Sequence, residues 1–189
     1  MRRIFVVLAV LITAFLAGCA SPNIVSSVTV FHSLNGSESN KTYMIEATPE
    51  QANNLEFNSY VTLLNQELQR HGFAMVSKDP GLKVTLRYGT SQTVASTLEP
   101  APYFGFYGRH GYGGYSGWQT AVDTFYMHQM EVSINQAADG KNIYSVRTRL
   151  LSSSPELSLS MDYLIESAFQ NFPGKNGMTE TVSLPPHPQ

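Results

Sequence analysis

Hydrophobic residues alternate with polar ones over three stretches of the chain, at 82–88, 122–134 and 144–150. A period of two places successive side chains on opposite faces of a strand, so each stretch predicts a half-buried strand. Runs of β-branched and aromatic residues at 28–31 and 42–45 predict two more strands, with Asn35-Gly36-Ser37 forming the turn between them.

The last two of the alternating stretches are joined by Asp139-Gly140, and their apolar positions determine how they pair. A two-residue turn would set Ile134 opposite Ser145 and put the apolar faces out of step. A three-residue loop, Ala138-Asp139-Gly140 with Gly140 in the left-handed region, sets Ile134 opposite Tyr144. We therefore predict the three-residue loop. It also pairs Val132 with Val146, Glu131 with Arg147 and Gln129 with Arg149.

Capping signals followed by apolar residues at helical spacing predict two helices. Thr48-Pro49-Glu50-Gln51 is a capping box with proline at the first helical position, and Gly72 ends this first helix. Ser154-Pro155-Glu156 begins the second helix in the same way, and Pro173-Gly174 ends it. The predicted buried stripes are Phe57, Val61, Leu64 and Leu68 in the first helix, and Leu157, Met161, Leu164, Ala168 and Phe172 in the second.

The order of these elements is ββα followed by βββα. This order predicts an α+β domain with a single antiparallel sheet of about five strands and two helices packed on one face. The domain is expected to span residues 28–173. The polar, proline-rich residues 174–189 are expected to form a disordered tail.

The first residues of the chain have the pattern of an export signal. Arg2 and Arg3 precede an uncharged apolar run, which ends in Leu16-Ala17-Gly18-Cys19. The alternative is a membrane-spanning helix, but Ile4 to Ala17 is shorter than the ~20 residues that a span needs. The pattern resembles a bacterial lipoprotein signal, in which the cysteine is acylated and becomes the new N-terminus.

That resemblance implies a cleaved signal peptide at 1–18 and a lipidated tether at 19–27. Cys19 would carry a diacylglycerol and an N-acyl chain, the only attached group that the sequence leads us to expect. Ala20 and Ser21, rather than aspartate, follow the cysteine, which by the same resemblance favours the outer membrane.

Cleavage would remove 18 of the 189 residues, including two of the 12 basic ones, and change the net charge from −2 to −4. A domain of that charge has no general attraction to nucleic acid, so no nucleic-acid partner is expected. The single cysteine excludes an intrachain disulfide, and 42% hydrophobic residues suffice for an ordinary core.

Residues 101–119 are rich in glycine and aromatic residues and are predicted to form a loop between two strands. Aromatic side chains supply large contact surfaces, and glycine supplies backbone freedom. The loop is therefore a candidate binding surface for sugar, peptide or a partner protein, although a flexible insertion without a ligand fits the same composition. The candidate residues are Tyr103, Phe104, Phe106, Tyr107, Tyr112, Tyr115 and Trp118.

No catalytic or metal-binding residues are predicted. The histidines lack the spacing of metal ligands, and His128 falls on the apolar side of its strand, where a hydrogen-bonded core histidine is expected. Asp123 and Glu131 lie on one strand roughly 27 Å apart, too far for a glycosidase pair. The Gly-x-Ser-x-Gly motif of serine hydrolases is absent from the sequence.

Several short motifs, taken in order, resemble a family of envelope lipoproteins known only as domain of unknown function four-one-three-six. They cover the chain from about Ile24 to Pro173. The resemblance implies an envelope lipoprotein of α+β fold with a glycine- and aromatic-rich central loop, and it supplies no catalytic residue. The motifs are Thr42-Tyr43, Leu68 to Phe73, Asp79 to Val84, Met130 to Ile134, Asp139 to Tyr144, and Phe172-Pro173.

These observations predict a lipid-anchored, periplasm-facing module that is not an enzyme and that binds the membrane through its lipid. Its expected partner is another envelope protein or peptidoglycan. Two alternatives stay open. The first is a carrier or sensor of a small apolar or sugar-like ligand held between sheet and loop, and the second is a hydrolase.

Overall fold

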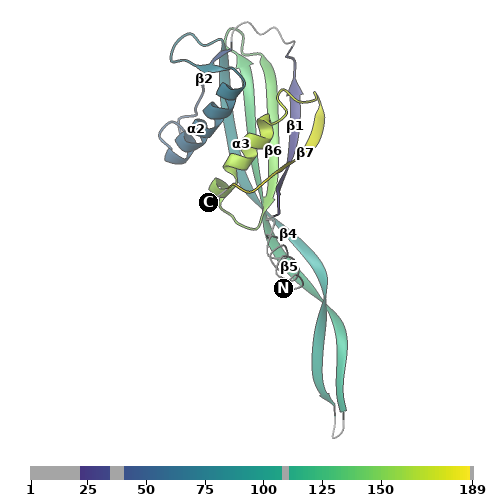
Figure 1. The fold of residues 1–189 in the computed structure, drawn as a ribbon. Coiled ribbons are helices and arrows are strands. Elements are labelled where there is room, and N and C mark those ends of the chain that lie inside the picture. Colours follow the sequence, from purple (N-terminus) through teal and green to yellow (C-terminus); the bar gives the residue numbers. More distant parts are fainter. Residues whose placement is uncertain (1–21, 35–40, 108–110, 188–189) are drawn as a thin grey trace, which may run out of the picture.

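The computed structural model describes residues 22–34, 41–107 and 111–187, with the backbone alone for 101–107 and 111–117. Within these residues, seven strands form one sheet in the order β3-β2-β4-β5-β6-β1-β7 (Figure 1). The strands are β1 (Ile24–His32), β2 (Thr42–Ile45), β3 (Ala74–Met75), β4 (Leu82–Tyr107), β5 (Gly111–Gln136), β6 (Asn142–Ser152) and β7 (Met178–Leu184). The helices are α2 (Leu55–Arg70), α3 (Met161–Phe169) and the short 3₁₀ turn η1 (Leu157–Leu159).

The sheet is mixed, so the predicted antiparallel sheet of about five strands is wrong. β2 runs parallel to both β3 and β4, whereas the other neighbours are antiparallel. The two parallel pairs arise because α2 follows β2 and precedes both β3 and β4 in the chain, and a helical crossover carries the chain back to the end where β2 began. β3 was not predicted because it has only two residues, too few to show the alternation of apolar and polar residues that indicates a strand.

The second additional strand, β7, lies where the sequence predicted a disordered tail. It pairs antiparallel with β1 from Ile24–Leu184 to Val30–Met178. Val182 and Leu184 are only 4% and 3% exposed and belong to the core. Pro185 and Pro186 follow at once and end the strand, because proline cannot continue a hydrogen-bonded ladder. The prolines therefore mark the end of a strand rather than a disordered segment.

Helix α2 begins later than predicted. The reciprocal hydrogen bonds of the capping box do form, since the Thr48 N–H donates to Gln51 Oε1 at 3.0 Å and the Gln51 N–H to Thr48 Oγ1 at 3.4 Å. They close a separate turn, however. The N-cap is Asn54, whose Oδ1 accepts from Glu56 N at 2.8 Å and Phe57 N at 3.2 Å. The predicted end at Gly72 is confirmed, because this glycine has a φ of +80°.

The buried stripes of the two helices are largely as predicted. In α2, Phe57, Leu64 and Leu68 are buried, but Tyr60 takes the place of the half-buried Val61. The second helix begins with the turn η1, and α3 proper starts at Met161. Its buried residues are Met161, Leu164, Ile165, Ser167, Ala168 and Phe169.

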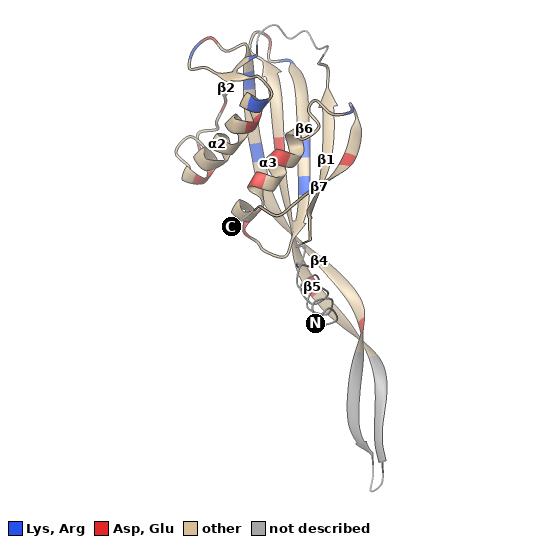
Figure 2. Ribbon diagram, in the orientation of Figure 1, with Lys and Arg blue, Asp and Glu red and all other residues tan. Residues whose placement is uncertain are grey.

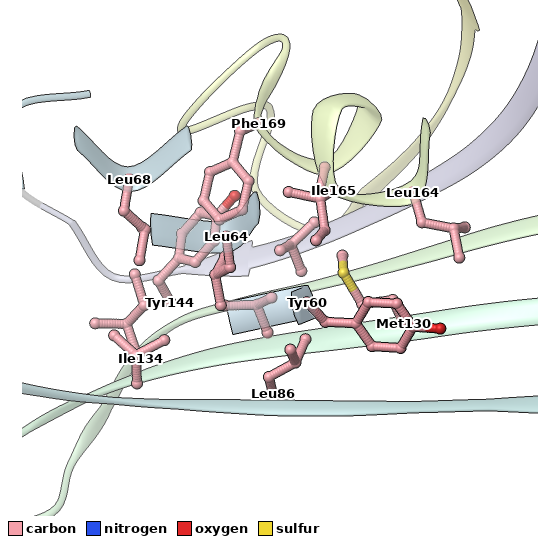
Figure 3. Close-up of a cluster of buried hydrophobic side chains, with 14 of the residues drawn as sticks. Tyr60, Leu64, Leu68, Leu86, Met130, Ile134, Tyr144, Leu164, Ile165 and Phe169 are labelled. Atoms are coloured by element: carbon pink, nitrogen blue, oxygen red, sulfur yellow. The ribbon is translucent and has the colours of Figure 1, made fainter. Parts of the chain in front are cut away.

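Both helices cover the same face of the sheet, and side chains fill the space between (Figure 3). Tyr144 lies at the centre with no exposed surface, and its ring centroid is 5.0 Å from that of Phe172 and 6.3 Å from that of Phe169. Tyr43 is also fully buried, and burial raises the pKa of its hydroxyl to about 12. Its hydroxyl donates to Asn65 Oδ1.

The predicted pairing of β5 with β6 is confirmed. Ile134 lies opposite Tyr144, and Val132, Glu131 and Gln129 lie opposite Val146, Arg147 and Arg149. Gly140 has a φ of +71°, in the left-handed region, as expected. The connection is longer than the predicted three residues, because β5 ends at Gln136 and β6 begins at Asn142, with a register shift after Ile134.

Candidate functional site: a projecting hairpin

The most prominent feature outside the core is the hairpin of β4 and β5. The two strands pair continuously from Leu82–Gln136 to Tyr107–Gly111, but β6 accompanies β5 only as far as Tyr126. Beyond that point the strands pair only with each other, and they project from the sheet as a twisted two-stranded ribbon (Figure 1). We refer to residues 93–107 and 111–125 as the ribbon. Each of its strands has 15 residues, which corresponds to a length of about 50 Å.

The ribbon replaces the loop predicted at 101–119. Within that range the backbone of residues 101–107 and 111–119 is strand, and Tyr103 lies opposite Tyr115, Phe104 opposite Gly114 and Phe106 opposite Tyr112. The stretch is not a loop because aromatic residues favour extended backbone, and a partner strand of similar composition pairs with every one of these positions. The side chains of the candidate residues Tyr103, Phe104, Phe106, Tyr107, Tyr112 and Tyr115 lie outside the described structure, whereas that of Trp118 is described.

Near the sheet, the ribbon has one apolar face. Val94, Leu98, Trp118 and Val122 are 59%, 70%, 73% and 63% exposed. Directly opposed residues of an antiparallel pair point to the same face. Because Val94 pairs with Thr124, Leu98 with Thr120, Ser96 with Val122 and Pro100 with Trp118, these four apolar side chains share that face.

The opposite face of this part of the ribbon carries the charges. Glu99 pairs with Gln119 and Asp123 with Ala95, which places both carboxylates on the other side from Leu98 and Trp118. The four exposed apolar side chains and the two carboxylates of this part of the ribbon therefore lie on opposite faces. Solvent-exposed apolar groups gathered on one side of a protruding element are typical of a binding surface.

The sequence analysis missed one contact, between a serine and a histidine. His128 is fully buried, as predicted for a core histidine, and its Nδ1 lies 2.9 Å from Ser160 Oγ. Burial lowers the pKa of His128, an effect partly offset by the backbone of Pro155 and Ser154. Ser160 is only 4% exposed, and no carboxylate contacts the histidine ring among the described residues. The pair is a hydrogen bond within the core and lacks the third, orienting group of a catalytic triad.

A second histidine fastens the C-terminal segment to α3. His187 Nδ1 lies 2.8 Å from Asp162 Oδ2, and Nε2 lies 2.9 Å from Glu166 Oε2. The ring stacks on Tyr163 at 4.4 Å, and the His187 backbone N–H donates to the Tyr163 hydroxyl at 2.7 Å. The hydrogen bond to Asp162, followed by that to Glu166, raises the pKa of His187. We call these contacts the clasp; they hold residues 185–187, which follow β7, against α3.

The remaining candidate chemistry is limited. Asp123 lies on the ribbon and Glu131 within the sheet, where Arg147 Nη2 donates to Glu131 Oε2 at 2.7 Å. The described residues include no group of three or more His, Cys, Asp or Glu side chains that could hold a metal ion. In the same part of the chain, no helix is long and apolar enough to cross a membrane. Cys19 lies outside the described residues.

The structure also has open hollows at its surface. One of about 590 Å³ lies where β1 begins, β6 ends and α3 starts, and its apolar lining includes Ile24, Leu151 and Leu159. Another, of about 260 Å³, lies on the face of the sheet that the helices leave uncovered. Both open to solvent, and neither lies between the sheet and the ribbon.

The fold and the hairpin define a class of protein, a helix-covered mixed sheet with an extended β-hairpin arm. A family profile described as "Domain of unknown function (DUF4136)" matches residues 28–174. The chain belongs to this family, and the resemblance seen in its sequence motifs is confirmed. No curated protein matches the chain.

One solved structure shares the fold of this chain at low sequence identity. A crystal structure of a PDZ domain protein from Parabacteroides distasonis ATCC 8503 has a TM-score of 0.56 and 16% identity over 90% of this chain. The chain spans only 42% of the length of that protein. Two structures of the PelC dodecamer from Paraburkholderia phytofirmans have TM-scores of 0.41 and 12% identity, covering 76% of this chain and 93% or 94% of theirs.

Proposed function

We propose that this protein is a lipid-anchored lipoprotein of the bacterial envelope that acts as a non-enzymatic binding module. In this proposal the ribbon is the arm that contacts another envelope protein. The observation that carries it is the apolar face of the ribbon, where Val94, Leu98, Trp118 and Val122 are all more than half exposed. Leaving such side chains in water is unfavourable, and a protein partner that covers them recovers free energy at about 25 cal/mol per Å².

The interior of the domain supports a binding role over that of a ligand carrier. A carrier would hold its ligand in a pocket between sheet and hairpin. Instead, Tyr144, Phe169 and Leu64 fill the space between helices and sheet and have no exposed surface, and the larger hollows are open to solvent. The ribbon projects from the domain and exposes apolar side chains, and both features favour binding to a partner protein.

Photo-crosslinking from the two faces of the ribbon tests this role. A photoreactive residue is placed in living cells at Leu98 or Val122 on the apolar face. The matched controls are Thr97 and Ala121, which pair with each other on the opposite face. We expect one and the same envelope protein to be captured from Leu98 and Val122 and not from the controls. Equal capture from all four positions, or from none, would contradict the proposal.

The captured protein is then purified and added to this protein in solution. Trp118 is the only tryptophan of the chain and is 73% exposed, so its fluorescence reports directly on the ribbon. We expect a saturable shift of emission to shorter wavelength as the indole leaves water. The double variant Leu98→Gln/Val122→Gln should lose the shift, and Thr97→Gln/Ala121→Gln should keep it. A captured protein that leaves the Trp118 emission of the parent unchanged would count against the arm.

The anchor is tested separately. We expect the parent to incorporate labelled palmitate and to sediment with the outer membrane on a density gradient. Cys19→Ser should lose both properties, because Cys19 is the only cysteine that can be acylated. Unchanged fractionation and processing of Cys19→Ser would refute the anchor.

A further inference from the structure

The uncovered face of the sheet carries three arginines around a hollow. Arg87 on β4 lies opposite Glu131 on β5, and Glu131 lies opposite Arg147 on β6. In the next row of the same face, Gly89 lies opposite Gln129, which lies opposite Arg149. The side chains of Arg87, Arg147 and Arg149 all line the hollow of about 260 Å³, together with Gln129 and Glu131. Figure 2 shows basic bands on these strands of the sheet.

Glycine at position 89 lies opposite Gln129, which lines the hollow. A Cβ built at Gly89 would have no atom within 4 Å, so the space above this position is free. Every other position in the two rows carries a polar or charged side chain. The Cα atoms of Arg87 and Arg149 lie two strands and two residues apart, roughly 12 Å by ordinary sheet spacings. Two arginine side chains can reach across such a gap to a single anion that lies between them.

The charge of the hollow is unbalanced. Both Nε and Nη2 of Arg147 donate to Glu131 Oε2, at 3.1 and 2.7 Å. Arg87 and Arg149 have no ion pair with any described residue. Three guanidinium groups thus face one carboxylate, in a chain whose net charge is −2. A local excess of positive charge on an acidic protein favours binding of a negatively charged ligand.

We propose that this hollow is a binding site for a phosphate group carried by a larger polar molecule. Arginine presents a planar fork of donors that matches the oxygens of phosphate. Gln129 adds an amide that can donate to a third oxygen. The volume of about 260 Å³ exceeds that of a single phosphate, so the group would be attached to a headgroup or a sugar. This site lies apart from the ribbon and does not depend on the proposed arm.

The first test measures binding of inorganic phosphate to the full-length mature protein in a non-ionic detergent, at low salt. The arginine Nε–H signals are followed by NMR. We expect those of Arg87 and Arg149 to shift saturably, and Arg87→Gln or Arg149→Gln to weaken binding by at least about tenfold, since each removes charge-assisted hydrogen bonds. The matched control is Arg70→Gln on α2, whose ion pair with Glu67 lies on the surface away from the hollow. It should bind like the parent.

A charge-neutral variant separates a built site from general attraction to basic residues. Gly89 has no positive φ, and the space beside it is open, so Gly89→Leu fits the strand and places an apolar side chain next to Gln129, which lines the hollow. We expect it to weaken phosphate binding as strongly as the arginine variants, with unchanged thermal unfolding. Binding of Gly89→Leu at the level of the parent would overturn the proposal, as would the absence of saturable shifts in the parent.

A second experiment identifies the kind of molecule that carries the phosphate. Detergent micelles containing phosphatidylglycerol are compared with micelles containing phosphatidylcholine and with glucose 6-phosphate in solution. Shifts caused by phosphatidylglycerol and abolished by Gly89→Leu would assign the site to a lipid headgroup. Shifts caused by glucose 6-phosphate and abolished by the same variant would assign it to a soluble phosphorylated ligand. If inorganic phosphate, phosphatidylglycerol and glucose 6-phosphate all cause no saturable shift, the site is refuted, and the proposed role of the ribbon is unaffected.

Discussion

The C-terminal strand β7 gives the sharpest test of the fold, because the sequence alone predicted no structure there. The perturbation is the double variant Val182→Ala/Leu184→Ala, at two core positions that are 4% and 3% exposed. A buried leucine changed to alanine costs about 2–5 kcal/mol. The two methyl groups lost from valine add about 1.6 kcal/mol. The residues are neighbours on one face and share a cavity, so we expect a total of about 4–6 kcal/mol rather than a strict sum.

Urea unfolding followed by circular dichroism measures this loss. Small domains unfold with slopes of about 1–3 kcal/mol per molar urea, so at a slope of about 2 the midpoint should fall by about 2–3 M. Thr181→Ala/Ser183→Ala is the matched control, since both residues are exposed on the same strand, and each change should cost no more than about 0.5 kcal/mol. If the core variant unfolds within about 0.5 kcal/mol of the parent, β7 does not hold the sheet together and the reasoning fails.

Three other predictions concern polar groups. His187→Ala should destabilise the protein most below pH 6.5 and less as the pH rises through the raised pKa of His187, because the protonated ring forms ion pairs with Asp162 and Glu166. Urea unfolding of parent and variant between pH 5 and 9 measures the difference in stability. A difference that grows with pH would contradict the role given to His187. His128 has a lowered pKa, so the folded state resists its protonation and stability should fall as the pH drops below about 6.5. His128→Leu should lose that dependence, and an equal fall in the variant would show that other groups cause it. Tyr144→Phe should leave stability unchanged or raise it, because the buried hydroxyl of Tyr144 has no hydrogen-bond partner among the described residues. Tyr43→Phe should cost about 1 kcal/mol, because it removes the hydrogen bond to Asn65. Thermal unfolding of the two variants tests this, and a lower stability of Tyr144→Phe than of Tyr43→Phe would refute it.

Local patterns predicted the parts of the fold that depend on near neighbours in the chain. The pairing of Ile134 with Tyr144 followed from apolar parity and one glycine, and the structure has that register. The buried side of α2 and its end at Gly72 followed from helical spacing and glycine chemistry. In each case a slip by one residue would expose apolar side chains, so the sequence leaves little freedom.

The errors arose where a local signal has two meanings. The capping box at Thr48 forms its hydrogen bonds in a single turn, and these bonds do not require a helix to follow. Proline after Leu184 marks the end of a strand as readily as it marks a disordered tail. Glycine among aromatic residues at 103–118 suggested a loop, but register shows the two halves pairing across the hairpin. That pairing joins residues that are far apart in the chain, so it cannot be predicted from a short segment of the sequence.

The candidate site was predicted only in part. The sequence singled out Trp118, and the structure places it on the apolar face of the ribbon with Leu98 and Val122. Those two residues were missed because their sequence pattern, an apolar residue at every fourth position, is also found in strands whose apolar side chains are buried. The arginine hollow was missed because it needs three strands side by side. Only the sheet order brings Arg87 and Arg149 to the same hollow.

The order of the strands also places the start of β1 and the ribbon at the same end of the sheet. Near the start of β1, Ser26 pairs with Leu150, and the ribbon leaves the sheet where Tyr126 pairs with Ser152. A tether from residue 19 to 23 reaches at most about 18 Å, whereas the ribbon extends about 50 Å. An anchored molecule would therefore hold its arm within reach of the membrane, and a partner seated in or on that membrane could meet the apolar face without leaving it. Arg149, opposite Ser27 on β1, lies near the same end, so a phospholipid headgroup and an envelope protein could be bound from one orientation of the domain.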